Sequence, residues 1–118
     1  MSTQQYDIGI YEGDSVRVGA ILTENGSPSN VEGFDLVLHM FNQAGESFDI
    51  DCSPGKEDPI THVVVTPASE GGITIPFTVA QTKCPGRYKA KVRTVNGTQQ
   101  VTFPDGNKYA DIVIWEAP

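Results

Sequence analysis

Residues 85–97 read PGRYKAKVRTVNG, and the pattern inside this stretch decides the fold. Successive side chains of a β-strand point to opposite faces of the sheet, so a cation at every second position predicts a strand with one solvent-facing side. Neighbouring cations on that side would lie about 6.6 Å apart. The four cations, half of the eight lysines and arginines in the chain, are Arg87, Lys89, Lys91 and Arg93.

The intervening positions predict the buried side of the same strand. Between the cations stand Tyr88, Ala90, Val92 and Thr94, which we expect to face the core. The dipeptide at 96–97, Asn-Gly, is a strong signal for a two-residue hairpin turn. It predicts a partner strand at 101–103.

Alternation with period two continues along most of the chain and predicts further strands separated by turn residues. Pro76 cannot donate a backbone hydrogen bond, so its strand is expected at a sheet edge or beside a bulge. Only residues 78–83 suggest a helical turn. These signals predict an all-β antiparallel sandwich or barrel of about seven to nine strands. The predicted strands are residues 6–11, 15–22, 34–41, 48–52, 61–66, 73–77, 88–95, 101–103 and 109–115.

Length and charge limit the classes of protein and partner. A chain of 118 residues fits one domain, with short loose termini expected at 1–5 and 116–118. No apolar run approaches the roughly 20 residues of a membrane span, so we expect no membrane partner. The polar residues after Met1 form no secretory signal, which predicts a protein made in a cytoplasm. The net charge of −7 repels phosphate backbones and argues against nucleic acid as a partner.

The cysteines and histidines give no pattern typical of a metal site. Cys52 and Cys84 form no CxxC motif, and without a secretory signal they are expected to be free thiols rather than a disulfide. His39 and His62 lie on different predicted strands with no third ligand nearby, so we expect surface imidazoles.

Four carboxylates bracket the loop at 53–59. They could gather oxygen ligands around calcium, which takes about six to eight, but their spacing matches no EF-hand loop, so a solvated acidic rim is the better interpretation. The chain also contains no GxSxG elbow, HExxH pair, P-loop or His-supported cysteine nucleophile. The sequence therefore predicts no enzymatic activity, no metal and no cofactor. The four carboxylates are Asp49, Asp51, Glu57 and Asp58.

The order of turn signals along the chain suggests a family. Residues 10–41 read IYEGDSVRVGAILTENGSPSNVEGFDLVLHMF, with a turn at Gly13-Asp14 and a G-x-P loop at 26–28. Residues 70–94 read EGGITIPFTVAQTKCPGRYKAKVRT, a strand, a short helical turn and a PGRY entry to the charged strand. Across nearly its whole length the chain resembles small immunoglobulin-like domains of tailed-phage virion proteins, including the N-terminal domains of upper baseplate proteins.

This resemblance implies that the cation strand pairs with the strand carrying Asp35 and His39 on one side and with the strand carrying Asp111 on the other. Asp35 and Asp111 would then face the cations as structural ion pairs. A second interpretation is that the same face docks on an acidic protein surface, because apolar and aromatic residues beside arginine are typical of interface cores. Besides the four cations, that interface would contain Val37, Phe41, Val113 and Trp115.

Two aromatic residues have expected roles in this architecture. Tyr88 begins the strand that holds the tyrosine corner, so its hydroxyl is expected to bond a nearby backbone group. Trp115 either packs against the end of the sandwich or takes part in a contact.

The resemblance also implies a non-enzymatic structural protein of a phage virion, made in the host cytoplasm. It would dock in many copies on other virion proteins, as a capsid decoration, a neck protein, or a tail or baseplate component. The alternative is a host-surface carbohydrate-binding or adhesion module carried on the virion. Aromatic residues in the loops 25–30, 42–47 and 53–59 would favour that alternative, and these loops contain none.

Overall fold

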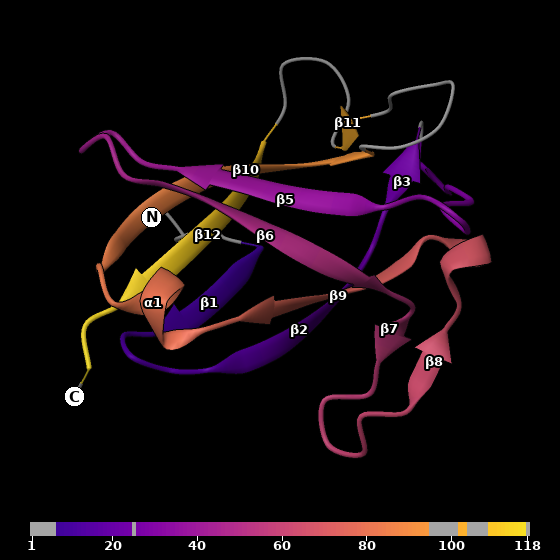
Figure 1. The fold of residues 1–118 in the computed structure, drawn as a ribbon, viewed down its shortest axis with the longest axis horizontal. Helices are drawn as coiled ribbons and strands as arrows, with labels where there is room; N and C mark the ends of the chain where they lie inside the picture. Colours follow the sequence, from indigo (N-terminus) through magenta and orange to yellow (C-terminus); the bar gives the residue numbers. More distant parts are fainter. Residues whose placement is uncertain (1–6, 25, 95–101, 104–108, 118) are drawn as a thin grey trace, which may run out of the picture.

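The computed structural model describes residues 7–24, 26–94, 102–103 and 109–117, and its regular structure is almost entirely β-strand (Figure 1). Its helical segments are a 3-10 turn, η1 (Ala68–Glu70), and a single helical turn, α1 (Val79–Thr82). No helix in the described part of the chain is long and apolar enough to cross a membrane. The strands are β1 (Ile8–Tyr11), β2 (Val16–Ile21), β3 (Thr23–Glu24), β4 (Ser27–Pro28), β5 (Leu36–Phe41), β6 (Ser47–Pro54), β7 (Lys56–Glu57), β8 (Val64–Thr66), β9 (Gly72–Phe77), β10 (Gly86–Thr94), β11 (Thr102–Phe103) and β12 (Ala110–Trp115).

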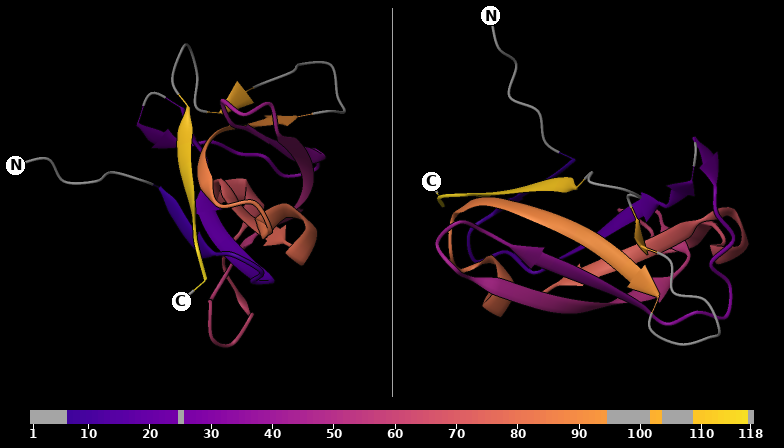
Figure 2. Two further views of the ribbon diagram at one scale, coloured as in Figure 1. Left: turned by 90° about the vertical axis from the view of Figure 1, so that its left-hand side faces the viewer. Right: turned by 90° about the horizontal axis from the view of Figure 1, so that it is seen from above.

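The strands form a sandwich of two layers because one long strand belongs to both. Within the described residues the main sheet has the order β1-β12-β10-β5-β6-β9-β2, with β11 beside β10. Most of β6 pairs with β5, whereas Ser53 and Pro54 at its end pair with Thr74 and Ile73 of β9. The sheet thus folds over, and β9 and β2 cover the inner side of the other strands (Figure 2). The predicted all-β sandwich is confirmed.

One pair of strands departs from the predicted antiparallel arrangement. β1 pairs with β12 in parallel, with Ile8 opposite Ile112 and Tyr11 opposite Trp115. The other described strand pairs are antiparallel, as predicted. Parallel pairing is possible here because β1 and β12 lie far apart in sequence, so no tight hairpin forces them to run in opposite directions.

The core lies between the layers and follows the predicted alternation. In β10, Ala90 faces Met40 of β5, and Val92 faces Leu38. All four of these side chains are buried. Apolar burial of this kind is the main favourable term in folding. Because these residues face the core, the alternate residues of β10 face solvent.

The tyrosine corner is confirmed. The hydroxyl of Tyr88 donates a hydrogen bond to the carbonyl oxygen of Cys84 at 2.8 Å. Burial raises the pKa of this hydroxyl, which keeps it protonated as the donor. The bond fixes the turn through which the chain enters β10, the strand that carries the cations.

The predicted helical turn is confirmed, whereas the predicted edge position of the strand with Pro76 is wrong, because β9 lies between β6 and β2 with no bulge in its pairing to β2. Thr78 caps α1, and the side chain of Gln81 accepts a hydrogen bond from the backbone N–H of Thr78 at 2.6 Å, which is a capping box. Pro76 pairs with Arg17 of β2, beyond the two residues of β9 that pair with β6. The pairing between β9 and β6 therefore does not include Pro76.

The predicted strand at 61–66 is partly wrong. The strand observed there, β8, begins only at Val64, and His62 lies in a turn with a positive φ of 60°. The reason is the side chain of Asp58, which accepts hydrogen bonds from the backbone N–H groups of Ile60 and Thr61 at 2.8 and 3.0 Å. Such a turn competes with extended structure.

Other differences concern short strands and the hairpin turn. The strand predicted at 48–52 extends to Pro54 as β6, and the two-residue strands β3, β4 and β7 were not predicted. The hairpin turn predicted at 96–97 lies outside the described residues. Its partner strand is observed as β11, which pairs antiparallel with β10.

Candidate protein-binding face

The sheet formed by β6, β5, β10 and β12 has one side toward the core, and we call its other side the outer face. On β10 the buried residues alternate with the cations, as the sequence predicted. Arg87, Lys89 and Arg93 are exposed, and Lys91 is half-buried. We call Arg87, Lys89, Lys91 and Arg93 the cation stripe, or the stripe. Because β10 lies between β5 and β12, the stripe runs through the interior of the outer face, with other strands on both sides.

Lys89 lies between an acid and an aromatic ring. The sheet register places it opposite Asp111 of β12 and opposite Phe41 of β5. Its Nζ lies 2.7 Å from Oδ1 of Asp111, so the predicted ion pair with Asp111 is confirmed. Asp35, the other predicted partner of the stripe, lies one residue before β5 and outside the register that joins β5 to β10.

Lys91 is the first of three polar side chains that lie in a row across β10, β5 and β6. It lies opposite His39, and Nδ1 of His39 lies 2.5 Å from Oδ1 of Asp49 on β6. The ammonium of Lys91 also stands 4.7 Å from the centre of the Tyr109 ring, a geometry in which a cation is attracted to the π-face. His39 is an exposed imidazole, as predicted.

Arg93 lies at the far end of the stripe. It faces Val37 of β5, which in turn faces Asp51 of β6. A shallow hollow of about 310 Å³ is lined by Arg93, Val37, His39 and Asp49. From Lys89 to Arg93, therefore, the cations in the middle of the face are flanked by carboxylates of β12 or β6.

Aromatic rings gather beside the cations. Phe41 lies between His39, at 5.7 Å between ring centres, and Tyr109, at 5.6 Å in an edge-to-face arrangement. At the other side of the sheet, Trp115 packs on Tyr11 of β1 at 5.2 Å. Trp115 thus packs against the edge of the sandwich, and its part in a partner contact stays a prediction.

One of the four apolar and aromatic residues of the predicted interface is less exposed to a partner than expected. Val113 faces outward between Gly9 of β1 and Arg87 of β10, yet only 6% of it is exposed. A short side chain in an interior strand is covered by longer neighbours such as arginine, whose aliphatic part lies along the sheet. Val37, Phe41 and Trp115 are half-buried and keep surface that a partner could contact.

A groove at the start of the stripe was not predicted. It has a volume of about 570 Å³ and lies between the β5–β6 turn and the beginning of β10, with Phe41, Arg87 and Lys89 among its lining residues. Sequence reasoning also missed Tyr109 and Tyr11 as members of the outer face. Tyr109 has the same parity as Asp111 in its strand, so alternation could have placed it, whereas Tyr11 depends on the parallel pairing of β1.

The acidic residues around the loop at 53–59 bind different partners and do not form one site. Glu57 is bound by Arg17, with Nη2 2.6 Å from Oε2, and Asp58 holds the turn before β8. Asp49 pairs with His39 on the outer face. Within the described ranges, no three potential ligands converge on one point, and Cys52 and Cys84 are free thiols.

Taken with the strand order, this geometry defines the class of the protein: an immunoglobulin-like β-sandwich with a mixed-charge, aromatic outer face. No model of a known protein family matches the chain, and no curated protein shows significant sequence similarity to it. Among solved structures, it is similar to the N-terminal domain of phage TP901-1 ORF48, with a TM-score of 0.58 and 16% identity. The match covers 96% of this chain and 91% of that one, so the two share a fold over nearly their whole length.

Proposed function

We propose that the chain is a non-enzymatic structural component of a tailed-phage virion that docks on other virion proteins through its outer face. The observation that carries this proposal is the similarity in fold to a phage protein domain over 96% of the chain. Fold alone does not define function, so the docking role is argued from the outer face itself.

The outer face has the composition of an interface core. Arginine and aromatic residues are enriched where proteins bind one another, and here Arg87 and Arg93 share a face with Phe41, Tyr109 and Trp115. In a chain with a net charge of −7, the stripe is a local region of positive charge. An acidic partner surface would be attracted to the stripe and repelled by the flanking carboxylates. Such alternation of sign fixes the register of docking more than it adds affinity.

A small domain suffices for this role when many copies act together. Weak contacts repeated in a symmetric assembly reinforce one another through effective concentration. We therefore infer many copies per particle, on capsid, neck or tail proteins, after synthesis in the host cytoplasm. This role requires no nucleic acid, membrane or cofactor.

The test is the position of the chain in purified particles of the phage that encodes it. We expect mass spectrometry to detect it as a virion protein in many copies. We expect a density map of the particle to show the outer face against an acidic surface of a neighbouring protein. Absence from purified particles would contradict the virion role, and an outer face directed to solvent would contradict the docking role alone.

A second candidate is a carbohydrate-binding module on the virion. The groove beside Phe41, Arg87 and Lys89 favours it, because sugars stack on aromatic rings and bond to polar side chains. A glycan array probed with the full chain discriminates the two. Binding to a defined glycan that is lost in Phe41→Ala, with no affinity for virion proteins, would place this candidate first.

A further inference from the structure

A hairpin on the sandwich displays aliphatic side chains to solvent. It is formed by β7 and β8, which make a separate two-stranded sheet, and it extends away from the body of the fold (Figure 1). Ile60 is 85% exposed, Val63 62% and Val65 60%. Neighbouring apolar side chains that are exposed to solvent on a protruding hairpin are typical of an interaction site. We call Ile60 and Val63–Val65 the hairpin tip.

The hairpin is fixed in place. At its base, Thr74 donates a hydrogen bond to the carbonyl of Gly55 at 2.7 Å and accepts one from the N–H of Glu57 at 3.1 Å. The carboxylate of Glu57 is bound by Arg17 of β2 through two hydrogen bonds, at 3.0 and 2.6 Å. At the turn, the backbone N–H of His62 donates to the carbonyl of Asp58 at 2.9 Å, which holds His62 at its positive φ. A surface that is held rigid loses little entropy on binding.

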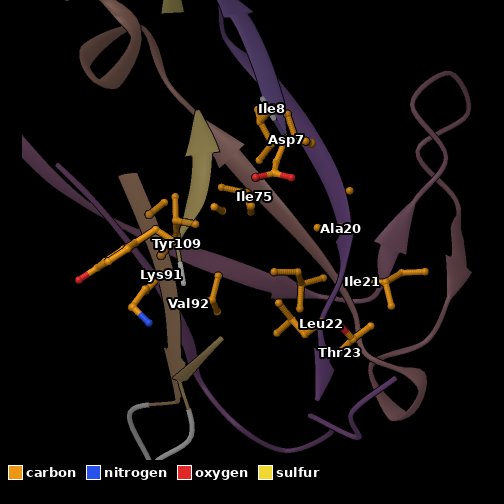
Figure 3. A pocket seen from close by; sticks show the side chains of 16 residues that line it. Asp7, Ile8, Ala20, Ile21, Leu22, Thr23, Ile75, Lys91, Val92 and Tyr109 are labelled. Carbon is orange, nitrogen blue, oxygen red and sulfur yellow. The ribbon is translucent and has the colours of Figure 1, made fainter. Parts of the chain in front are cut away.

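A complementary hollow exists elsewhere on the same chain. It has a volume of about 680 Å³ and lies between β2 on one side and β1, β10 and β12 on the other (Figure 3). We call it the β1–β2 trough. Within the described residues β1 and β2 do not pair with each other, so each strand leaves one edge unpaired there. The walls are mainly aliphatic and include the side chains of Ile8, Val18, Ala20 and Ala110, whereas the side chain of Ile21 points to the hairpin side of β2 (Figure 3).

The chain's own hairpin does not fill the trough. None of the residues that line it belongs to β7, β8 or the turn between them. The hairpin base packs on β2 and β9, and β2 stands between the hairpin and the trough (Figure 3). Among the described residues, therefore, neither the convex nor the concave apolar surface is covered by the other, and both can meet another molecule.

We propose that the hairpin tip of one copy of this chain docks in the β1–β2 trough of a second copy. The two surfaces match in chemistry, since aliphatic side chains would enter an aliphatic hollow. Their charges are also complementary. The turn of the hairpin carries the carboxylate of Asp58, and the mouth of the trough carries the ammonium of Lys91, so docking can place these opposite charges near each other.

The symmetry of the assembly follows from this contact. A contact between two different surfaces is heterologous: it repeats from copy to copy and produces a ring when the rotation closes, or a filament when it does not. The contact leaves the β6 side of the outer face accessible. It is independent of the proposed function, because a chain with any function could associate in this way.

The test uses association of the full chain, measured by sedimentation velocity over a concentration series. We expect the wild-type chain to form dimers and larger species as concentration rises. Val63→Lys on the tip and Ile8→Lys in the trough, where Ile8 is half-buried, should each weaken association about tenfold or more. The matched control is Val79→Lys, at an aliphatic residue on α1 that is 55% exposed, and it should associate like the wild type.

Mixing the two variants tests the heterologous geometry directly. The Val63→Lys chain keeps an intact trough and the Ile8→Lys chain keeps an intact tip, so the mixture should form a dimer of one of each and stop there. A wild-type chain that stays monomeric throughout the series overturns the proposal. Association that Ile8→Lys leaves unchanged, or that mixing does not restore, overturns it in favour of tip-to-tip contact or another surface.

Discussion

The ammonium of Lys89 lies 2.7 Å from the carboxylate of Asp111, in a register that places the two residues directly opposite each other on β10 and β12. The side chains of both residues keep contact with water, at 54% and 27% exposure. Exposed ion pairs of this kind contribute only about 0.2 to 1 kcal/mol. The pair therefore orients Lys89 on the outer face without being necessary for the fold.

Exchanging the two charges separates docking from folding. The double variant Lys89→Asp with Asp111→Lys keeps the net charge and the cross-strand pair but places an acid in the middle of the stripe. We expect the free energy of unfolding to change by less than about 1 kcal/mol, as measured by urea denaturation. Binding to virion proteins should be lost. If the exchanged chain assembles into particles as well as the wild type does, the stripe is not the docking surface.

The tyrosine corner gives a second prediction. Tyr88→Phe removes the hydroxyl that donates to Cys84 while the buried ring stays in place. We expect a loss of about 1 kcal/mol in the free energy of unfolding, the usual net value of one hydrogen bond. The matched control is Tyr109→Phe, which removes a hydroxyl from an exposed ring and should change stability very little. Equal effects of the two changes would show that the corner adds no stability.

The sequence predicted the strands correctly wherever one face of a strand is buried and the other is exposed to water. The alternation in β10 and β5 sorts their residues correctly, because Ala90 and Leu38 meet the core while Lys89 and His39 meet water. The same reasoning could not identify β7, whose two residues are too few to show a period.

The hairpin tip and the trough show a different limit. The run of three valines at 63–65 is typical of a buried strand, yet these side chains are exposed. Nothing local in the sequence reveals that the partner strand is only two residues long. The trough combines strands from both ends of the chain, and its shape depends on the parallel pairing of β1 with β12. Such non-local pairing leaves no periodic signal.

Acid should destabilise the hairpin base. Hydrogen bonds from Arg17 lower the pKa of Glu57, and hydrogen bonds from the backbone N–H groups of Thr61 and Ile60 lower that of Asp58. A carboxyl whose pKa is lower in the folded state stabilises the fold above its unfolded pKa, about 4. This contribution is lost as pH falls through the folded pKa. We therefore expect unfolding midpoints to decrease below about pH 4, as followed by circular dichroism.

Variants identify which carboxyl is responsible. Glu57→Gln should be less stable than the wild type near neutral pH and should show a smaller further decrease in acid. Glu70→Gln, which removes a carboxyl from the exposed turn η1, controls for the change in net charge. An acid transition of unchanged size in Glu57→Gln and in Asp58→Asn would exclude the hairpin base as its origin.

The thiol of Cys52 should resist modification until the chain unfolds. Burial raises its pKa to about 12, so almost no thiolate, the reactive form, exists in the folded state. We expect iodoacetamide to label Cys52 at pH 8 only in denaturant, as measured by peptide mass. Because the folded pKa exceeds the unfolded one, this thiol stabilises the fold below the unfolded pKa of about 8.5, and the contribution is lost as pH rises toward 12. Rapid labelling of folded chains would show that the β6 side of the core opens frequently.

Two glycines with the same backbone conformation but different surroundings give the final prediction. Gly45 has a φ of 91° and open space where a Cβ would be, whereas Gly71 has a φ of 85° and would place a Cβ 2.5 Å from the carbonyl oxygen of Leu22. Gly45→Ala should lower the free energy of unfolding by about 1 to 2 kcal/mol, because the left-handed backbone conformation is the only feature there that disfavours alanine. Gly71→Ala should cost about 1 to 3 kcal/mol more, since the backbone of Leu22 must move and its N–H donates to the carbonyl of Gly71 at 2.8 Å. Urea denaturation of both variants measures the difference directly. Equal losses would mean that the end of β2 yields easily, and the wall of the trough that this segment forms would then be too soft to hold a docked hairpin.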